Sequence, residues 1–164
     1  MIGRVPRCTS EPTPTSEPVA DVWSYVTESI HPPPQPDLSP PGGDGVTGLE
    51  TFVGVLVPDP HTARISGGGG ALLDVEIEVS GITIDWGDGS SSTFPATSSA
   101  MAGYPDGIAT HIYETKDNDI TVSVSYDWTA RWRVAGGAWL TVAVPDTSTS
   151  VAYPVSEIVS VITN

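Results

Sequence analysis

Apolar and polar residues alternate along most of the chain after residue 46, which is the period of a β-strand with one buried and one wet face. In the clearest run, residues 120–134, every even position is apolar or aromatic and every odd position is polar. At about 3.3 Å per residue this run would extend some 50 Å, so we expect a bend or a bulge. Further strands are predicted at residues 51–57, 72–80, 82–86, 108–113 and 139–144, with a last strand within 151–163.

Each predicted strand has one apolar face, which is typical of antiparallel sheets and excludes a parallel sheet buried on both sides. Turn residues separate the strands, and Gly136-Gly137 is the sequence of a two-residue hairpin turn. Short antiparallel strands that share one core predict an all-β fold, an antiparallel β-sandwich.

The first 45 residues differ in composition, since ten of the 16 prolines lie between Pro6 and Pro41. Such stretches form extended linkers. Between them, apolar residues at helical spacing predict a short amphipathic helix near 18–30, with one face made of Val19, Val22, Trp23, Val26 and Ile30. A helix of about three turns is marginal alone, so it either frays or docks, on this sandwich or on a partner domain. We therefore divide the chain into a Pro-, Ser- and Thr-rich tail and linker (1–45) and a sandwich (46–164) that we expect to fold without the tail.

Charge narrows the possible partners. The chain has 20 acidic and 6 basic residues, a formal net charge of -14. Nucleic acid and anionic membranes are bound by basic surfaces, so we expect neither as a partner. No apolar run reaches the roughly 18 to 20 residues that span a bilayer, so no transmembrane segment is predicted. The segment "MIGRVPRCTSEP" lacks the apolar stretch of a secretory signal, and the single cysteine, Cys8, allows no internal disulfide.

The segment "ITIDWGDGSSSTF", residues 82–94, is the most specific candidate for chemistry. A phosphate cradle normally has more glycines, a following helix and a lysine, and none of these is present here. A calcium site would use Asp85 and Asp88, with Ser90, Asp117 and Asp119 as possible further ligands. We prefer the third interpretation, a tight turn in which Gly87 and Gly89 adopt positive φ and Asp88 accepts backbone hydrogen bonds.

Three segments together resemble a known family. "IDWGDG" (84–89), "THIYE" (110–114) and "NDITVSVSY" (118–126) occur in the order of the PKD domain signature, although Ile84, Trp86 and Ile120 replace the family's usual Trp, Phe and Tyr. The resemblance covers roughly residues 72–134. It implies an immunoglobulin-like sandwich in which a set of motif residues has a structural role: Asp85, Trp86, Gly87, Asp88, Gly89, His111 and Tyr113.

A wider similarity extends to uncharacterised PKD-like envelope proteins of actinobacteria, through "GLETFVGVLV", "VSYDWTARW" and the closing "VAYPVSEIVSV". It implies an extracellular or cell-envelope location and a role in adhesion, spacing or contact with a protein or glycan. The leading hypothesis is therefore a non-catalytic binding or spacer module without a cofactor. Two alternatives stay open: a structural subunit of a surface filament or virion, and an accessory domain of a glycan-acting enzyme.

Few residues outside the motif are candidates for ligand contact. Phe94 and Tyr104 lie in a predicted loop that needs no large aromatic residue for its turns, so they are the better candidates for ligand contact. The alternative is that they fold back and anchor the loop. Trp128 and Trp132 share the apolar face of the longest strand and are predicted to belong to the core. Asp74, Glu76 and Glu78 alternate with apolar residues and are interpreted as a solvated strand face. No G-x-S-x-G elbow is present, so no serine nucleophile is predicted.

Overall fold

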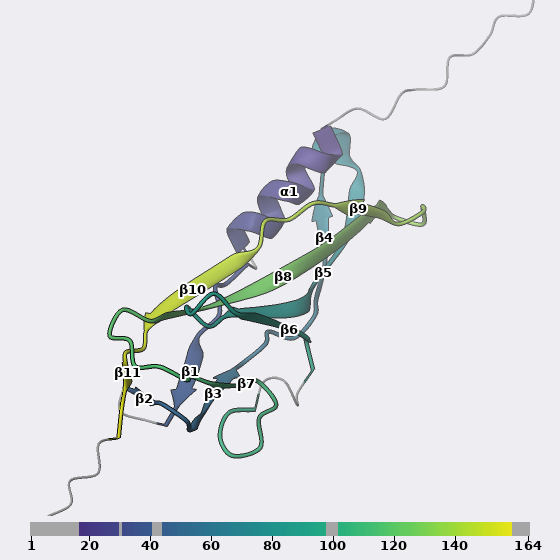
Figure 1. The fold of residues 1–164 in the computed structure, drawn as a ribbon. Helices are drawn as coiled ribbons and strands as arrows, with labels where there is room; N and C mark the ends of the chain where they lie inside the picture. The colour runs from purple at the N-terminus through teal and green to yellow at the C-terminus, as the bar shows by residue number, and fades with distance from the viewer. Residues whose placement is uncertain (1–16, 30, 41–43, 98–101, 159–164) are drawn as a thin grey trace, which may run out of the picture.

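The computed structural model describes residues 17–29, 31–40, 44–97 and 102–158 (Figure 1). Strands, nearly all antiparallel, make up about half of this part of the chain and are accompanied by one short α-helix, so the predicted all-β class is confirmed. The elements are α1 (Glu17–Ser29), β1 (Pro36–Ser39), β2 (Gly45–Val46), β3 (Glu50–Val55), β4 (His61–Ser66), η1 (Gly68–Gly70), β5 (Leu72–Asp85), β6 (Ser91–Pro95), β7 (Thr110–Ile112), β8 (Thr121–Val134), β9 (Leu140–Val142), β10 (Thr147–Ala152) and β11 (Val155–Ser156).

The strands form two antiparallel sheets and one small parallel pair. The larger sheet has the order β10-β8-β5-β4, with β6 paired to β5 and β9 paired to β8. The smaller sheet has the order β1-β3-β7, and β11 pairs with β2 in parallel. Strands β5 and β8 are each 14 residues long and pair with each other. On its other edge, β5 pairs with β4 along its first half and with β6 along its second half. Strand β8 likewise pairs with β10 along its first half and with β9 along its second half.

One continuous core fills the space beside the larger sheet, and two elements cover it. The three-stranded sheet lies at one end, and α1 lies near β4 and β9 at the other end (Figure 1). A strand of 14 residues is about 45 Å long, whereas β3 has six residues. The short sheet therefore cannot cover β5 and β8 alone, and α1 buries Val22 and Val26 completely in the same core.

The helix therefore docks on this chain's own sheet. Its contact face is narrower than the sequence predicts, because Val19 is 43% and Trp23 is 48% exposed. Ile30, the fifth residue of the predicted face, lies outside the described residues. Strand β1 also comes from the segment predicted to be a tail, and it pairs with β3. Helix α1 and strand β1 are thus in contact with the rest of the fold.

Several strand predictions need correction. Residues 72–85 form one strand, where the sequence predicted two that part at Gly81. A β-bulge between Val79 and Gly81 absorbs the extra residue, and pairing with β8 continues on both sides of it. The sequence predicted a bend or a bulge within residues 120–134. The bulge in this pair of strands lies instead in the partner strand β5. Strands β1, β2, β4 and β6 were not predicted, and β10 begins before the predicted last strand. Strand β11 lies within the predicted range 151–163, of which residues 159–163 lie outside the described residues.

The predicted buried face of residues 120–134 is confirmed at every even position from Ile120 to Trp132. Trp128 is 9% and Trp132 is 6% exposed, whereas Val134 is exposed at the end of β8. The predicted two-residue Gly136-Gly137 hairpin turn is not formed: the N–H of Gly137 donates to the carbonyl of Val134 (2.7 Å), so Ala135 and Gly136 are the central residues of the turn, with Gly136 at φ 80°. The connection is longer than two residues, because Trp132 and Leu140 are the nearest paired residues of β8 and β9. No helix within the described ranges has the length and apolarity to cross a membrane.

Candidate functional site

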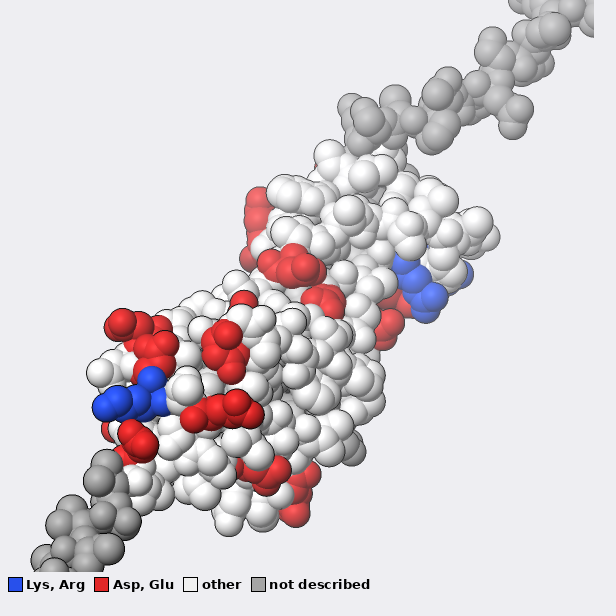
Figure 2. Space-filling view, in the orientation of Figure 1, with Lys and Arg blue, Asp and Glu red and all other residues white. Residues whose placement is uncertain are grey.

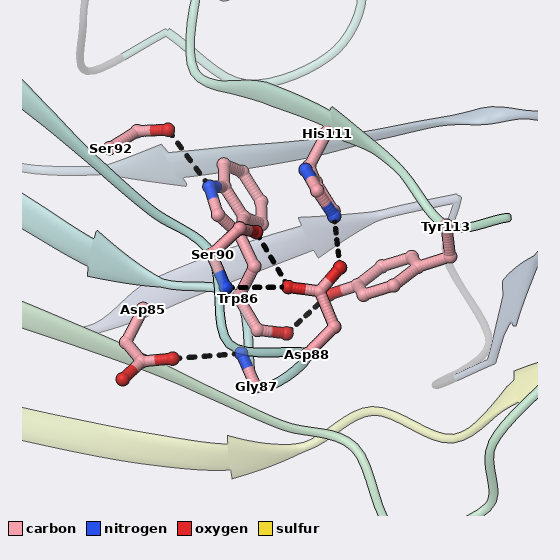
Figure 3. Close-up of polar contacts among 8 residues, drawn as sticks. All are labelled: Asp85, Trp86, Gly87, Asp88, Ser90, Ser92, His111 and Tyr113. Carbon is pink, nitrogen blue, oxygen red and sulfur yellow. Dashed lines mark hydrogen bonds and ion pairs between the residues drawn. The ribbon is translucent and has the colours of Figure 1, made fainter. Parts of the chain in front are cut away.

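The Gly-Asp-Gly segment begins directly after β5 and is closed by local hydrogen bonds (Figure 3). The backbone N–H of Gly87 donates to Oδ1 of Asp85 (2.9 Å), and the N–H of Ser90 donates to Oδ1 of Asp88 (3.0 Å). The N–H of Trp86 donates to the carbonyl of Ser90 (3.0 Å). Gly87 and Gly89 have φ of 81° and 91°, which a side chain disfavours. This geometry is that of a tight turn.

Trp86 joins this turn to the smaller sheet. Its ring is fully buried and its Nε1 donates to Oγ of Ser92 (3.0 Å). From β7 and the residue after it, His111 stacks on the Trp86 ring at 4.9 Å, and the Tyr113 hydroxyl donates to the Trp86 carbonyl (2.8 Å). The turn follows β5 of the larger sheet, whereas His111 belongs to the smaller sheet. These residues therefore fasten the two sheets together at one end.

The same side chains form a small electrostatic network. Nε2 of His111 lies 2.7 Å from Oδ2 of Asp88, and the Ser90 hydroxyl donates to Oδ1 of Asp88 (2.5 Å). Partial burial acts to raise the pKa of Asp88, but the hydrogen bonds from Ser90 and His111 outweigh it and hold this pKa below its usual value. Burial raises the pKa of Tyr113, and the nearby charge of Asp88 adds to that shift. The network therefore favours a charged Asp88 beside a neutral Tyr113.

The order of these groups does not match a hydrolytic triad. In a triad the imidazole lies between the hydroxyl and the carboxylate, where it removes the proton from the nucleophile. Here the carboxylate of Asp88 lies in the middle and is hydrogen-bonded to both Ser90 and His111. Among the described residues the imidazole bonds to Asp88 and to no hydroxyl, and the arrangement holds the turn in place.

The aspartates considered as calcium ligands have protein partners in the turn. Asp85 accepts from Gly87, and both oxygens of Asp88 accept from Ser90 and His111. Asp117 closes a separate turn by accepting from the N–H of Asp119 (2.9 Å). In the part of the chain that the structure describes, no three His, Cys, Asp or Glu side chains group as a metal site. Asp85 and Asp88 are therefore engaged in holding the turn.

The two aromatic residues predicted to contact a ligand lie in different places. Phe94 is in strand β6, where it pairs with Ile82 and packs partly buried on the core, so its assignment to a loop was wrong. Tyr104 is in a loop and is 69% exposed. Its ring lies edge-on to Phe52, with centroids 5.3 Å apart at 83°. A groove of about 440 Å³, the Tyr104 groove, is lined by Ser39, Pro40, Leu49, Glu50, Phe52 and Tyr104.

The sequence did not reveal a cluster of arginines on the outer face of the larger sheet. Arg64 and Arg133 both bind Asp74, at 2.7 and 3.0 Å, and Arg131 binds Glu76 at 2.5 Å. The guanidinium carbons of Arg131 and Arg133 lie 4.9 and 4.5 Å from the centre of the Trp139 ring. The hydrogen bonds from Arg64 and then Arg133 lower the pKa of Asp74. The predicted acidic face is therefore largely neutralised by cross-strand partners.

Comparison with known proteins identifies no relative: no family model, no curated protein and no solved structure matches the chain. The geometry of the described residues is therefore the basis for any functional conclusion. That geometry consists of a structural turn at one sheet junction, an exposed aromatic groove, and an arginine cluster paired with acids.

Proposed function

We propose that the protein is a non-catalytic binding module of the cell envelope, and that it contacts a protein or glycan through the Tyr104 groove. The observation that carries this proposal is the exposure of Tyr104, 69%, in a position where its ring is already oriented by Phe52. An oriented ring loses little conformational entropy when a ligand binds. Aromatic residues held in this way are common centres of binding surfaces.

The surroundings of Tyr104 support a contact surface. Leu49 is 50% exposed and Pro40 lies beside it in the groove, so an apolar surface faces the solvent. Glu50 adds a carboxylate at the same groove, which accepts hydrogen bonds from a sugar hydroxyl or a peptide N–H. This combination of aromatic, proline and acceptor fits a sugar ring or an extended peptide.

The resemblance to PKD domains supports the non-catalytic part and the location. In that family the Gly-Asp-Gly and His-x-Tyr elements are structural, and here their counterparts join two sheets. The envelope location rests on the same resemblance. A filament subunit and an accessory domain of a glycan-acting enzyme are the alternatives, and they differ from the proposal in the partner that the groove would hold.

The test is cosedimentation of the purified protein with isolated actinobacterial cell envelopes. We expect Tyr104→Ala to abolish binding with little change in the melting temperature, because an exposed ring contributes little to stability. Trp23→Ala is the matched control, since it removes an exposed aromatic residue at the other end of the molecule. Protease treatment of the envelopes then separates a protein partner from a glycan. Equal binding by both variants and the wild type would refute the assignment to this groove.

A further inference from the structure

The outer face of the smaller sheet is apolar, although it points away from the core. In β3, Val53 and Val55 are buried in the core, so by alternation Phe52 lies on the opposite face. Leu56, the residue after β3, is 83% exposed. Ile112 of the neighbouring strand β7, on the same face as Phe52, is 48% exposed. Apolar side chains that gather on a surface mark a place where a partner is bound.

Two grooves lie in line along this face. The second one, the Leu56 groove, has a volume of about 470 Å³. Ser39 of β1 and Phe52 of β3 line the Tyr104 groove. Asp37 and Gly54, from the same two strands, line the Leu56 groove. Phe52 and Leu56 are four residues apart in extended chain, so the two grooves are about 13 Å apart along the strand. The residues around the Leu56 groove are Gln35, Asp37, Gly54, Val55, Leu56, Ala102 and Gly103.

A loop crosses β3 between the two grooves. A Cβ added to Gly103 would lie 3.6 Å from Cα of Gly54, so the loop rests on the strand at this point. The ridge that it forms is low, because Gly103 has no side chain. In an extended peptide, side chains four residues apart point to the same side and span the same 13 Å or so. A peptide laid over Gly103 can therefore place one side chain in each groove.

The charged residues of both grooves are acidic. Glu50 lines the Tyr104 groove and Asp37 lines the Leu56 groove, and no lysine or arginine lines either of them. Both carboxylates are exposed, and neither forms an ion pair among the described residues, in contrast to Asp74 on the larger sheet. The visible face of the molecule carries many more acidic than basic side chains (Figure 2). Two copies that met through this face would bring like charges together, so the complementary partner is basic.

We propose that the partner at this face is a protein, bound through an extended segment that carries two aliphatic side chains about four residues apart and at least one lysine or arginine; this inference rests on the proposed function of the Tyr104 groove. Aliphatic side chains bury apolar surface on both partners when they pack on Leu56 and the groove walls. The basic residue pairs with Glu50 or Asp37 at the rim. A glycan fits less well, because Leu56 and Ile112 offer a sugar neither an aromatic face nor a hydrogen bond.

Selection from a phage-displayed library of random nonapeptides on the full chain tests the chemistry of the partner. Phage that also bind the Tyr104→Ala variant are removed, so that only peptides that use the Tyr104 groove are enriched. We expect a consensus with two aliphatic residues about four positions apart and a lysine or arginine. No enriched peptide, or a consensus without a basic residue, would overturn the proposal.

Titration calorimetry with the synthetic consensus peptide tests whether both grooves are used. Leu56→Ser should weaken binding by about tenfold without a change in melting temperature, because Leu56 is exposed. The matched control is Leu140→Ser, which removes a leucine that is 52% exposed in β9 of the larger sheet. Equal affinity of the Leu56→Ser and Leu140→Ser variants would overturn the use of the Leu56 groove.

A pair of double variants tests the charge of the partner. Asp37→Asn with Glu50→Gln should weaken binding of the consensus peptide by roughly three- to tenfold. The control, Glu28→Gln with Glu78→Gln, removes two exposed acidic charges outside both grooves. Equal weakening by both double variants would mean that the peptide responds to net charge alone and would overturn the proposal. Envelope binding that depends on Tyr104 but survives protease treatment would overturn it too, while the proposed function of the groove would stand.

Discussion

The two glycines of the Gly-Asp-Gly turn provide a paired test of how this turn is built. Both have positive φ, 81° at Gly87 and 91° at Gly89. Their surroundings differ. A Cβ added to Gly87 would lie 2.5 Å from the carbonyl oxygen and 2.9 Å from the backbone nitrogen of Thr121, whereas a Cβ added to Gly89 would meet no atom within 4 Å. The sequence motif therefore contains one glycine needed for close approach and one needed for conformation.

The structure gives each substitution an expected cost. Alanine at positive φ is destabilising by roughly 1–2 kcal/mol, which is the whole expected effect of Gly89→Ala. Gly87→Ala adds a clash with backbone atoms at the start of β8, which cannot rotate away as a side chain would. Overpacking of that kind costs typically about 1–3 kcal/mol more. The total for Gly87→Ala is therefore about 2–5 kcal/mol, roughly twice that of Gly89→Ala.

Thermal and urea unfolding, followed by tryptophan fluorescence, measures both variants against the wild type. A domain of this size loses about 2–4 °C in melting temperature per kcal/mol, so Gly89→Ala should fall by a few degrees and Gly87→Ala by about 5–20 °C. The comparison depends on the contact with Thr121 and not on helix or strand propensity. Equal losses in the two variants, or a larger loss for Gly89→Ala, would refute the account.

Four further outcomes follow from the same structure. Trp86→Ala should cost about 3–5 kcal/mol in denaturant unfolding, because the ring is fully buried between the sheets; an unchanged midpoint would contradict that role. The pKa of Asp88 is lowered in the folded state, so its contribution to stability is present above its unfolded pKa and is lost as pH falls through the folded pKa. The stability gap between wild type and Asp88→Asn should therefore close on acidification, and a gap that widens would contradict the sign. Millimolar calcium against chelator should leave the melting temperature unchanged, and a rise on the order of 5 °C would restore the calcium alternative. A fragment of residues 46–164 should be less stable than 17–164 by at least about 3 kcal/mol, since Val22 and Val26 no longer cover the core and β1 no longer pairs with β3; equal unfolding midpoints would show that α1 and β1 contribute nothing.

Strands with a full apolar face could be read from the sequence, and edge strands could not. In β8 every second residue is buried from Val122 to Trp132, so the period alone identifies it. Strand β6 has the sequence SSTFP and lies at the sheet edge, where serine faces water and a terminal proline needs no ladder partner. Strand β1 is likewise short and begins with Pro36 in a proline-rich segment. The sequences of β1 and β6 resemble those of loops, because an edge strand buries few of its side chains.

Glycine occurs both in a turn and in a β-bulge of this chain, and the local sequence does not distinguish the two positions. At Gly87 the chain turns, whereas at Gly81 it continues through a bulge. The difference arises from β8, which pairs with β5 on both sides of the bulge and holds the strand together. A Cβ on Gly81 would lie 2.6 Å from Oδ2 of Asp127 on that partner. The information that decides between a turn and a bulge is therefore nonlocal.

The candidate sites show the same division between local and nonlocal information. Asp85 and Asp88 bond to backbone N–H groups two residues away, so the turn itself could be predicted. The arginine pairs could not, because they depend on register: Arg133 lies opposite Asp74 and Arg131 opposite Glu76 across β5 and β8. His31 and His61, 30 positions apart in the sequence, line one groove only because α1 docks on the sheet.

The segment between residues 17 and 40 is therefore more than a tether for the sandwich. It supplies Thr27, Glu28, His31 and Pro32 to a groove of about 530 Å³ between α1 and the larger sheet, and Ser39 and Pro40 to the Tyr104 groove. Both grooves lie between this segment and strands from the later part of the chain. A sandwich fragment would keep Tyr104 and Trp128 but lose one wall of each groove. Loss of binding by such a fragment would then report a missing wall and not a missing ligand, so binding has to be measured on the chain that includes α1 and β1.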